Sequence, residues 1–446
     1  MGGPTLQARG RPVSFATPAS PVPARPRWLP VVIQPSTSMI RSCLLLALGV
    51  SLASAEPRRD YSIPMLDLAK EDSLFTVVER RDTYLGHPST VLFRDGRTLL
   101  VAYPDGHGRG NLILRRSTDA GNTWQAVPVE AQRVEETPIL YRLDLPGGVE
   151  RVLLVTCRPQ QGVLEWMWSD DRGATWSPRQ DWRLEGTKGI IVALASLWPV
   201  PGGQPLWRGV FHDHNFDNYT VDLQLEASAG GAPACRFTNL RRIDYTTPDG
   251  LAAARRAGLC EAGLVVRPDG KRLALLFRPE KRLTNSMVAF SDDAGLTWTD
   301  PRELPGALTG HRHESVNLAD GRTMVFMRDF SPLNPGNPSH GDWVAWVGTF
   351  ADLENNREGQ YRIRLRRNYG NSTNNNVGDC GYSGVEALPD GRVLAVTYGH
   401  WDLVPGSQHP NHPDGRGKPP YILQVRLDPR QTDRWVGEPS RRVPGK

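Results

Sequence analysis

The sequence lacks the features that define several large classes of protein. Five cysteines in 446 residues are too few for a disulfide-stapled scaffold. No apolar run reaches the ~20 residues that a membrane-spanning helix needs, so we expect no span in the mature chain. Positive charge is in excess only within residues 1–59, which contain seven arginines and one glutamate. The net charge of this segment is larger than the formal net charge of +5 of the whole chain. The rest is nearly neutral, and we expect no nucleic-acid partner.

The first residues read as an export signal. Residues 39–55 join a short basic lead to an apolar core of signal-peptide length and to the small residues Ala53-Ser54-Ala55. We therefore predict cleavage near Ala55 and export to the periplasm or the medium. Residues 1–38 are then a disordered or mistranslated leader, and the sequence leaves open whether translation begins at Met39. A disordered tail with a chance apolar run is the alternative.

Four cysteines follow the predicted cleavage site: Cys157, Cys235, Cys260 and Cys380. They allow three full disulfide pairings, and the sequence does not choose among them. An exported protein can oxidise them, although a core of this size does not need disulfides.

The pattern S-x-D-x-G-x-T-W occurs three times, at residues 117–124, 169–176 and 291–298. Each copy follows an apolar run. Asp can bond its own backbone and Gly tolerates positive φ, so the pattern suits a tight hairpin turn. The Thr and Trp then begin the next strand, where the Trp packs on the sheet. We predict three equivalent hairpins.

A second set of turns alternates with these hairpins and lies between strand-like runs. Its members are Asp95-Gly96, Gly147-Gly148, Gly202-Gly203, Asp269-Gly270, Asp320-Gly321 and Asp390-Gly391. Three of these turns precede the Asp of a hairpin by the same 24 residues. Repeats of this length indicate a repeat architecture, and short strands with frequent turns indicate β structure. The sequence therefore predicts an all-β, six-bladed β-propeller of four-stranded blades.

These hairpins resemble the Asp-boxes of the sialidase (neuraminidase) superfamily. The resemblance covers residues 75–435, with an N-terminal extension at 56–74 and a C-terminal tail at 436–446. It implies an exo-acting glycoside hydrolase that releases a terminal acidic sugar, sialic acid or a related one, from a glycan. We expect no cofactor and no metal. The pairs His212-x-His214 and His311-x-His313 have ligand spacing, but no cysteine or carboxylate cluster completes a shell.

The resemblance assigns two catalytic residues. Tyr382 opens the first strand of blade six, where the family has its nucleophile, and Glu261 opens the first strand of blade four, where the family has the activating base. A phenol with a pKa near ~10 is a poor nucleophile at neutral pH. A carboxylate within hydrogen-bond reach can take its proton during attack, which is why sialidases depart from the paired-carboxylate scheme.

The arginine clamp of the family is not matched. Gly86, Ser286 and the stretch near Gly341-Asp342 stand where the family has three arginines that hold the substrate carboxylate. Replacements are available at the ends of second strands: Arg109, Arg278, Arg282 and Arg328.

The remaining candidates lie in loops on the mouth face of the predicted propeller. Asp105 or His107, in a loop with three glycines, is our candidate for the general acid. The glycines indicate either backbone close to a ligand or a flexible loop. All ten histidines fall on this face by our placement, and we add His87, His313, His340 and His400 as substrate-binding candidates.

Other functions fit the same pattern. A uronate-polysaccharide lyase or a histidine-dependent glycosidase would use the same histidines, arginines and Tyr382. A non-catalytic carbohydrate-binding propeller is the alternative from a different class. The sequence does not fix the sugar, the linkage or the oligomeric state.

Overall fold

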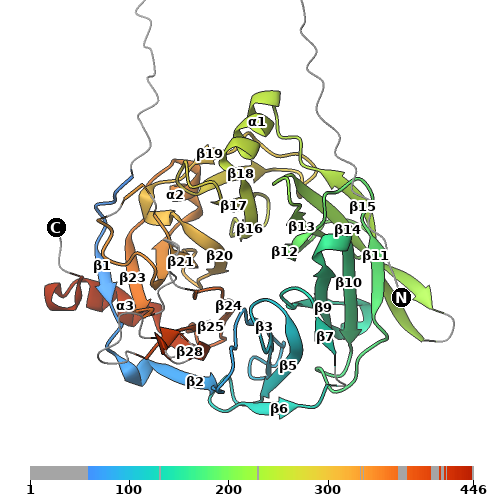
Figure 1. Cartoon of the computed structure of the whole chain (residues 1–446), viewed down its shortest axis with the longest axis horizontal. Coiled ribbons are helices and arrows are strands. Elements are labelled where there is room, and N and C mark those ends of the chain that lie inside the picture. The colour runs from blue at the N-terminus through green and yellow to red at the C-terminus, as the bar shows by residue number, and fades with distance from the viewer. Residues whose placement is uncertain are drawn as a thin grey trace, which may run out of the picture. The chain divides into compact units, whose positions relative to one another are not determined.

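Six sheets form a ring around a central channel (Figure 1). This computed structural model describes residues 59–129, 132–228, 231–331, 333–334, 336–369, 379–402, 411–412, 416–417 and 419–443. The predicted leader and export signal lie outside the described residues. The six-bladed, mostly β architecture predicted from the turns is confirmed.

Each blade has four antiparallel strands, which follow one another from the channel outward. Blade one contains β3 (Ser89–Leu92), β4 (Leu99–Pro104), β5 (Gly110–Ser117) and β6 (Gln125–Val127), and β7 (Arg133–Val134) also pairs with β5. Blade two contains β8 (Ile139–Asp144), β9 (Glu150–Arg158), β10 (Val163–Ser169) and β11 (Gln180–Arg183). Blade three contains β12 (Ile191–Pro199), β13 (Leu206–His212), β14 (Asn218–Ser228) and β15 (Gly231–Arg242).

The other three blades repeat this order. Blade four contains β16 (Leu259–Val266), β17 (Leu273–Pro279), β18 (Met287–Ser291) and β19 (Arg302–Glu303). Blade five contains β20 (Gly310–Asn317), β21 (Thr323–Asp329), β22 (Trp343–Gly348) and β23 (Tyr361–Arg366). Blade six contains β24 (Gly384–Ala387), β25 (Val393–Gly399), β28 (Tyr421–Leu427) and β2 (Phe75–Glu79).

Helices are few and peripheral. The α-helices are α1 (Pro248–Ala257), α2 (Phe350–Glu354) and α3 (Pro429–Val436). Short 3₁₀ turns lie at Asp72–Leu74, Pro146–Gly148, Pro159–Gln161, Gly306–Leu308 and Pro439–Arg441, and β26 (Asn411–His412) pairs with β27 (Arg416–Gly417). Within the part of the chain that the structure describes, no helix is long and apolar enough to cross a membrane.

Strands from the start of the chain close the ring. β2 is the outermost strand of blade six and runs antiparallel to β28. β1 (Met65–Asp67) adds a fifth, parallel strand to blade five beside β23. Closure leaves blade six without an unpaired outer edge at β28, the kind of edge that invites association with other chains.

The three S-x-D-x-G-x-T-W segments adopt one turn. In the first, the Ser117 hydroxyl donates to Asp119 at 2.7 Å, and Asp119 accepts the Thr123 amide at 2.9 Å. The other two copies form the same bonds.

Each central glycine of these turns has φ between 81° and 85° and lies against the preceding blade. A Cβ on Gly121 would lie 2.5 Å from Leu394 of blade six. Each turn therefore requires glycine both for its backbone conformation and for the fit between blades.

The hydrophobic core lies between neighbouring blades. Trp298 is buried in the cluster shared by blades three and four, while Trp124 and Trp176 pack against the clusters at the two sides of blade one. The four cysteines that follow the predicted cleavage site are buried and free. The disulfide pairing that the sequence left open is therefore not formed among the described residues.

Candidate active site

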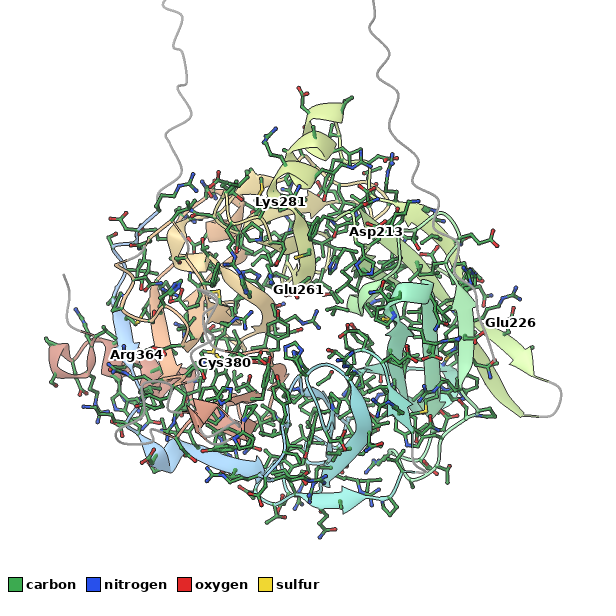
Figure 2. All side chains as sticks on the ribbon, viewed as in Figure 1. Asp213, Glu226, Glu261, Lys281, Arg364 and Cys380 are labelled. Carbon is green, nitrogen blue, oxygen red and sulfur yellow. The ribbon has the colours of Figure 1, made fainter. Side chains whose placement is uncertain are left out.

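The innermost strands begin with left-handed backbone at residues other than glycine. The φ angles are 56° at His87, 50° at Val192, 49° at Glu261 and 53° at Arg312. In blades three, four and five the register with the second strand shifts at the same place, which marks a β-bulge. Bulges redirect side chains, and strained backbone concentrates at functional sites. Figure 2 shows Glu261 at the rim of the central opening.

A cavity of about 460 Å³ lies at this mouth of the channel. All six blades contribute to its wall. The polar and aromatic lining residues are His87, His107, Glu136, Thr137, Glu261, Arg278, Glu280, Arg282, His311, Arg328, Phe330, Asp379 and Tyr382. A volume of this size suits a small ligand such as a sugar.

Tyr382 and Glu261 meet in this cavity as the sequence predicted. The Tyr382 hydroxyl lies 2.9 and 2.8 Å from the two carboxylate oxygens of Glu261. Nη1 of Arg278 donates to Glu261 Oε1 at 2.8 Å and to the Tyr382 hydroxyl at 2.7 Å. One guanidinium therefore contacts both members of the pair, which come from blades four and six.

The charges around the pair fix its resting protonation. Burial acts to raise the pKa of Glu261, but the Arg278 guanidinium, the Tyr382 hydrogen bond and the fields of His212 and Arg312 bring it to about 2. Burial raises the pKa of Tyr382 well above its usual value, and Arg278 opposes that rise. At neutral pH the pair is a phenol that donates to a carboxylate.

Asp379 is the centre of a second polar cluster at the cavity wall. It accepts hydrogen bonds from the Tyr84 and Tyr398 hydroxyls and lies 3.3 Å from Nε2 of His107. Burial would raise the pKa of Asp379, but the neighbouring His107, His87 and Arg328 hold it at about 2. Asp379 is therefore ionised and orients His107, whose ring is 69% exposed toward the cavity side.

His87, His107 and Asp379 place three possible metal-ligand atoms within 4.8 Å of one another. Hydrogen bonds already use the relevant atoms. Nδ1 of His87 accepts the Gly108 amide at 3.2 Å, and Nε2 contacts the Tyr398 hydroxyl at 3.1 Å. Both oxygens of Asp379 accept from tyrosines. We therefore interpret the cluster as a hydrogen-bond network. The two His-x-His pairs belong to no such group among the described residues.

Three of the four candidate arginines reach the cavity. Arg278, Arg282 and Arg328 line it, and Arg109 does not. Nη2 of Arg328 lies 2.7 Å from Nδ1 of His311, and the Arg282 guanidinium lies 4.9 Å from the centre of the Phe330 ring.

Asp105 has a different place from the one we expected of a general acid. It is not among the lining residues, and its carboxylate accepts the Asn111 amide at 2.7 Å and the Asn111 side chain at 2.8 Å. Asp105 thus holds its own loop in shape. In the same loop, Gly108 leaves room for Glu136, since a Cβ there would lie 3.0 Å from Glu136 Oε1.

The candidate histidines divide into two groups. His87 and His107 line the cavity, and burial lowers the pKa of His87 to about 3, so its ring is neutral. His313, His340 and His400 do not line it. Nε2 of His313 is 3.0 Å from the Leu308 carbonyl, and His340 packs behind Phe330 with ring centres 5.3 Å apart.

Sequence reasoning missed several lining residues: Glu136, Glu280, His311, Phe330 and Asp379. Glu136 precedes the first strand of blade two, and Asp379 lies three residues before Tyr382. Their position just before an innermost strand is the signal that could have found them, because the resemblance placed Glu261 and Tyr382 at the start of such strands. Burial raises the pKa of Glu136, which favours its neutral form.

Comparison with known proteins gives a match in fold. No protein-family model and no curated protein matches the sequence. A structure of a Dyadobacter fermentans protein of unknown function matches with a TM-score of 0.55 and 17% identity, over 79% of this chain and 97% of that one. A mutant NanB sialidase from Streptococcus pneumoniae matches with a TM-score of 0.51 and 10% identity, over 80% and 70%.

A third structure is a leech intramolecular trans-sialidase complexed with 2,7-anhydro-Neu5Ac. It matches with a TM-score of 0.51 and 14% identity, over 80% of this chain and 69% of that one. These identities are low, so the comparison concerns the fold. The chain has a six-bladed β-propeller fold that is similar to the fold of these two sialidase structures.

Proposed function

We propose that the protein is an exo-acting glycoside hydrolase of sialidase type, which releases a terminal acidic sugar from a glycan. The observation that carries this proposal is the contact of the Tyr382 hydroxyl with both oxygens of Glu261 inside a sugar-sized cavity. A tyrosine activated by a carboxylate is the nucleophile arrangement of sialidases. The fold shared with the sialidase and the trans-sialidase supports a glycan substrate.

The reaction proceeds through a covalent intermediate. The Tyr382 oxygen attacks the anomeric carbon while Glu261 takes the phenolic proton, and the glycosidic bond breaks. His107, held by Asp379, protonates the leaving oxygen. Water then attacks the same carbon and gives a proton to His107, while Glu261 returns its proton to the departing Tyr382 oxygen. Because the nucleophile is neutral before attack, it meets no repulsion from an anionic substrate.

Arginines at the cavity wall favour an acidic sugar. Arg278 forms ion pairs with Glu261 and Glu280. Arg328 contacts the His311 ring nitrogen. Arg282 and Arg328 lie on the side of Phe330 and His311. We assign the substrate carboxylate to Arg282 and Arg328, with Arg278 dedicated to the charge of the Tyr382–Glu261 pair.

The test is covalent trapping. Wild-type protein is incubated with an activated sialoside that carries fluorine beside the anomeric carbon, and the digest is examined by mass spectrometry. We expect a glycosyl adduct on the peptide that contains Tyr382, and loss of both adduct and turnover in Tyr382→Phe. Tyr361→Phe is the matched control, since Tyr361 is a buried tyrosine of blade five away from the cavity.

The second candidate is elimination from a uronate polysaccharide. His107 and Tyr382 line one cavity and can remove a proton beside the carboxylate and protonate the leaving oxygen. Turnover that creates absorbance in the ultraviolet, without an adduct on Tyr382, would replace hydrolysis by this reaction. Glycan binding without any product would replace both by a binding module.

A further inference from the structure

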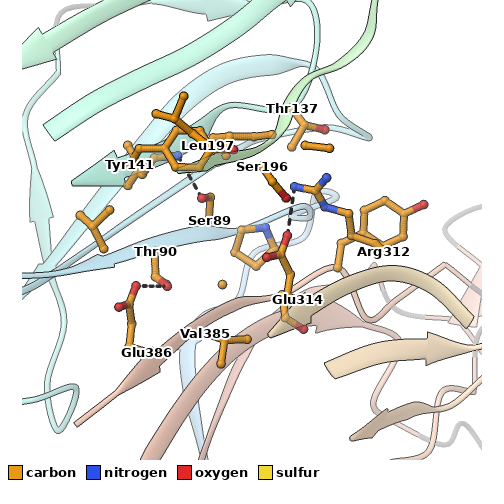
Figure 3. Close-up of a pocket in the computed structure, with 18 of the residues that line it drawn as sticks. Ser89, Thr90, Thr137, Tyr141, Ser196, Leu197, Arg312, Glu314, Val385 and Glu386 are labelled. Carbon is orange, nitrogen blue, oxygen red and sulfur yellow. Dashed lines mark hydrogen bonds and ion pairs between the residues drawn. The ribbon is translucent and has the colours of Figure 1, made fainter. Parts of the chain in front are cut away.

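A second cavity, of about 450 Å³, occupies the channel next to the mouth cavity (Figure 3). The residues that line both cavities, and so lie between them, are His87, Thr137, Val192 and Tyr382. The second cavity extends along the innermost strands to Leu92 and Ala387, the last residues of β3 and β24. These strands end on the face opposite the mouth, so this cavity runs toward that face.

One buried cation in this cavity has hydrogen-bonding capacity left over. The Arg312 side chain is 7% exposed, and its Nη2 lies 3.1 Å from Glu314 Oε1. Nη1 of Arg312 is buried and has no hydrogen-bond partner among the described residues. Figure 3 shows Arg312 and Glu314 directed toward each other within the cavity. A buried donor of this kind is costly unless an acceptor reaches it.

Two carboxyl groups in this cavity can accept the hydrogen bonds that a ligand donates. Burial raises the pKa of Glu314 and of Glu386 to about 7, against the opposing field of Arg312 and the opposing hydrogen bond of Thr90 respectively. Glu386 accepts the Thr90 hydroxyl at 2.9 Å and keeps further acceptor positions. Near neutrality each carboxyl group can therefore accept or donate a hydrogen bond.

The rest of the wall mixes small hydroxyl groups with apolar surface. Ser89 and Ser196 line the cavity beside Leu197 and Val385. The hydroxyl of Tyr141 is used by the Leu194 carbonyl, so Tyr141 contributes its ring. A ligand that fits must have hydroxyl groups around a compact carbon frame.

We propose that the channel cavity binds an uncharged, polyhydroxylated ligand of monosaccharide size. Its hydroxyl oxygens accept from the 7% of the Arg312 side chain that remains exposed, and its hydroxyl protons are donated to Glu314 and Glu386. An anion would meet the two carboxylates, and a cation would meet Arg312, so an uncharged ligand fits the charges best. The volume lies within the ~300–1,000 Å³ that is usual for small-molecule sites.

The channel proposal rests on different residues from the proposed hydrolysis, because Arg312, Glu314 and Glu386 line the channel cavity and not the mouth cavity, although Arg312 also lowers the pKa of Glu261. The two proposals can therefore fail separately. Loss of trapping at Tyr382 leaves the channel site standing, and an unoccupied channel leaves the hydrolase standing.

The test uses D-glucose, D-galactose and N-acetyl-D-glucosamine as probes. Their affinities are measured by titration calorimetry on the full folded protein, and crystals are soaked with the tightest binder. We expect one sugar in the channel, with oxygens on Arg312 and Glu386. Glu386→Gln and Arg312→Met should each weaken binding by about tenfold or more, because each loses a hydrogen bond to a charged group.

Glu226→Gln is the control, since Glu226 is exposed on the β14–β15 hairpin and should leave the affinity unchanged. Circular dichroism and melting temperature confirm folding of every variant. If Arg312→Met does not fold, the affinity of Glu386→Gln tests the proposal, because this substitution preserves the size of the side chain. The proposal is overturned if soaked crystals contain only water in the channel, or if Glu386→Gln binds sugar as tightly as Glu226→Gln.

Discussion

The mouth cavity and the channel cavity hold carboxyl groups that are differently ionised, although the Glu261 side chain is 8% exposed and the Glu314 side chain 27% exposed. Glu261 and Glu314 lie one blade apart near the start of their innermost strands. Glu261 has a pKa of about 2, whereas Glu314 has a pKa of about 7. Burial acts in the same direction on both. The difference comes from the partners, because Arg278, Tyr382 and two further cationic or polar groups act on Glu261, while Arg312 alone opposes burial at Glu314.

Asp379 and Glu386 repeat the contrast. Asp379 has two histidines, an arginine and a tyrosine around it and a pKa of about 2. Glu386 has Thr90 and the more distant Arg142, and a pKa of about 7. Glu261 and Asp379 therefore hold fixed negative charge at the mouth, whereas Glu314 and Glu386 are titratable carboxyl groups in the channel.

Replacing Arg278 should have the largest effect on the difference between the pKa values of Glu261 and Glu314. Arg278→Met leaves the buried Glu261 carboxylate without its main counter-charge, so the pKa of Glu261 should rise. We expect turnover on a fluorogenic sialoside to fall by about 10²–10³-fold or more, and the free energy of unfolding in urea to fall by about 3–5 kcal/mol. In Arg278→Met with Glu261→Gln, much of the lost stability should return, since the orphaned charge is gone. An unchanged stability in the single variant would contradict our account of the pair.

Neutralising Asp379 should have a smaller effect on turnover than replacing Arg278. Asp379→Asn retains shape but takes the negative charge from beside His107, so we expect kcat to fall by about 10–100-fold, less than the ~10²–10⁴-fold that a general acid contributes, because His107 itself remains. The matched control is Asp105→Asn, which alters a carboxylate of the neighbouring loop that bonds Asn111. Steady-state kinetics with both variants separate the two candidates for the general acid. Equal losses would show that the loop, and not the Asp379–His107 contact, matters.

The channel carboxyl groups should give the smallest effect, a slope in stability with pH. Their folded pKa of about 7 exceeds the unfolded value of ~4.3, so the native state holds more protons between these values. The free energy of unfolding should therefore fall as pH rises from about 5 to about 8. Below about pH 4 it should fall again, as Glu261 and Asp379 approach their folded pKa of about 2.

Urea unfolding at several pH values measures this slope. The variant Glu314→Gln with Glu386→Gln should decline less between pH 5 and pH 8 than wild type, whereas Glu226→Gln should follow wild type. If the double variant keeps the full slope, the titrating groups lie elsewhere, and buried Asp342, with a pKa raised to about 7 by burial, is the next group to replace.

The two parts of the structure differ in how far the sequence predicts them. The blades follow from local turn chemistry, because Ser117, Asp119 and Gly121 make their bonds within one short segment that repeats. Tyr382 and Glu261 were assigned through the resemblance to sialidases, which have their nucleophile and base at the start of the corresponding innermost strands. Arg312 has the same kind of place and a left-handed backbone, but the bulge that redirects it depends on pairing between strands and leaves no mark in the local sequence.

The choice of general acid is also beyond what the local sequence predicts. Asp105 and His107 are equivalent by sequence, since both lie in one glycine-containing loop. Only the spatial approach of Asp379 from blade six and of Asn111 from the next strand separates them. The contact of His107 with Asp379 joins two blades and residues hundreds of positions apart, so the local sequence does not show it.

The pairing of Phe75 with Val425 has a consequence for how the chain reaches its folded state. A strand synthesised early finds its partner only after nearly all of the remaining chain has been made. Contacts between such distant residues are slow to form, because the intervening chain must first be ordered. Until then, β28 presents an open edge that β2 of a second molecule can occupy as readily as its own. High protein concentration during refolding should therefore yield strand-exchanged dimers with intact blades.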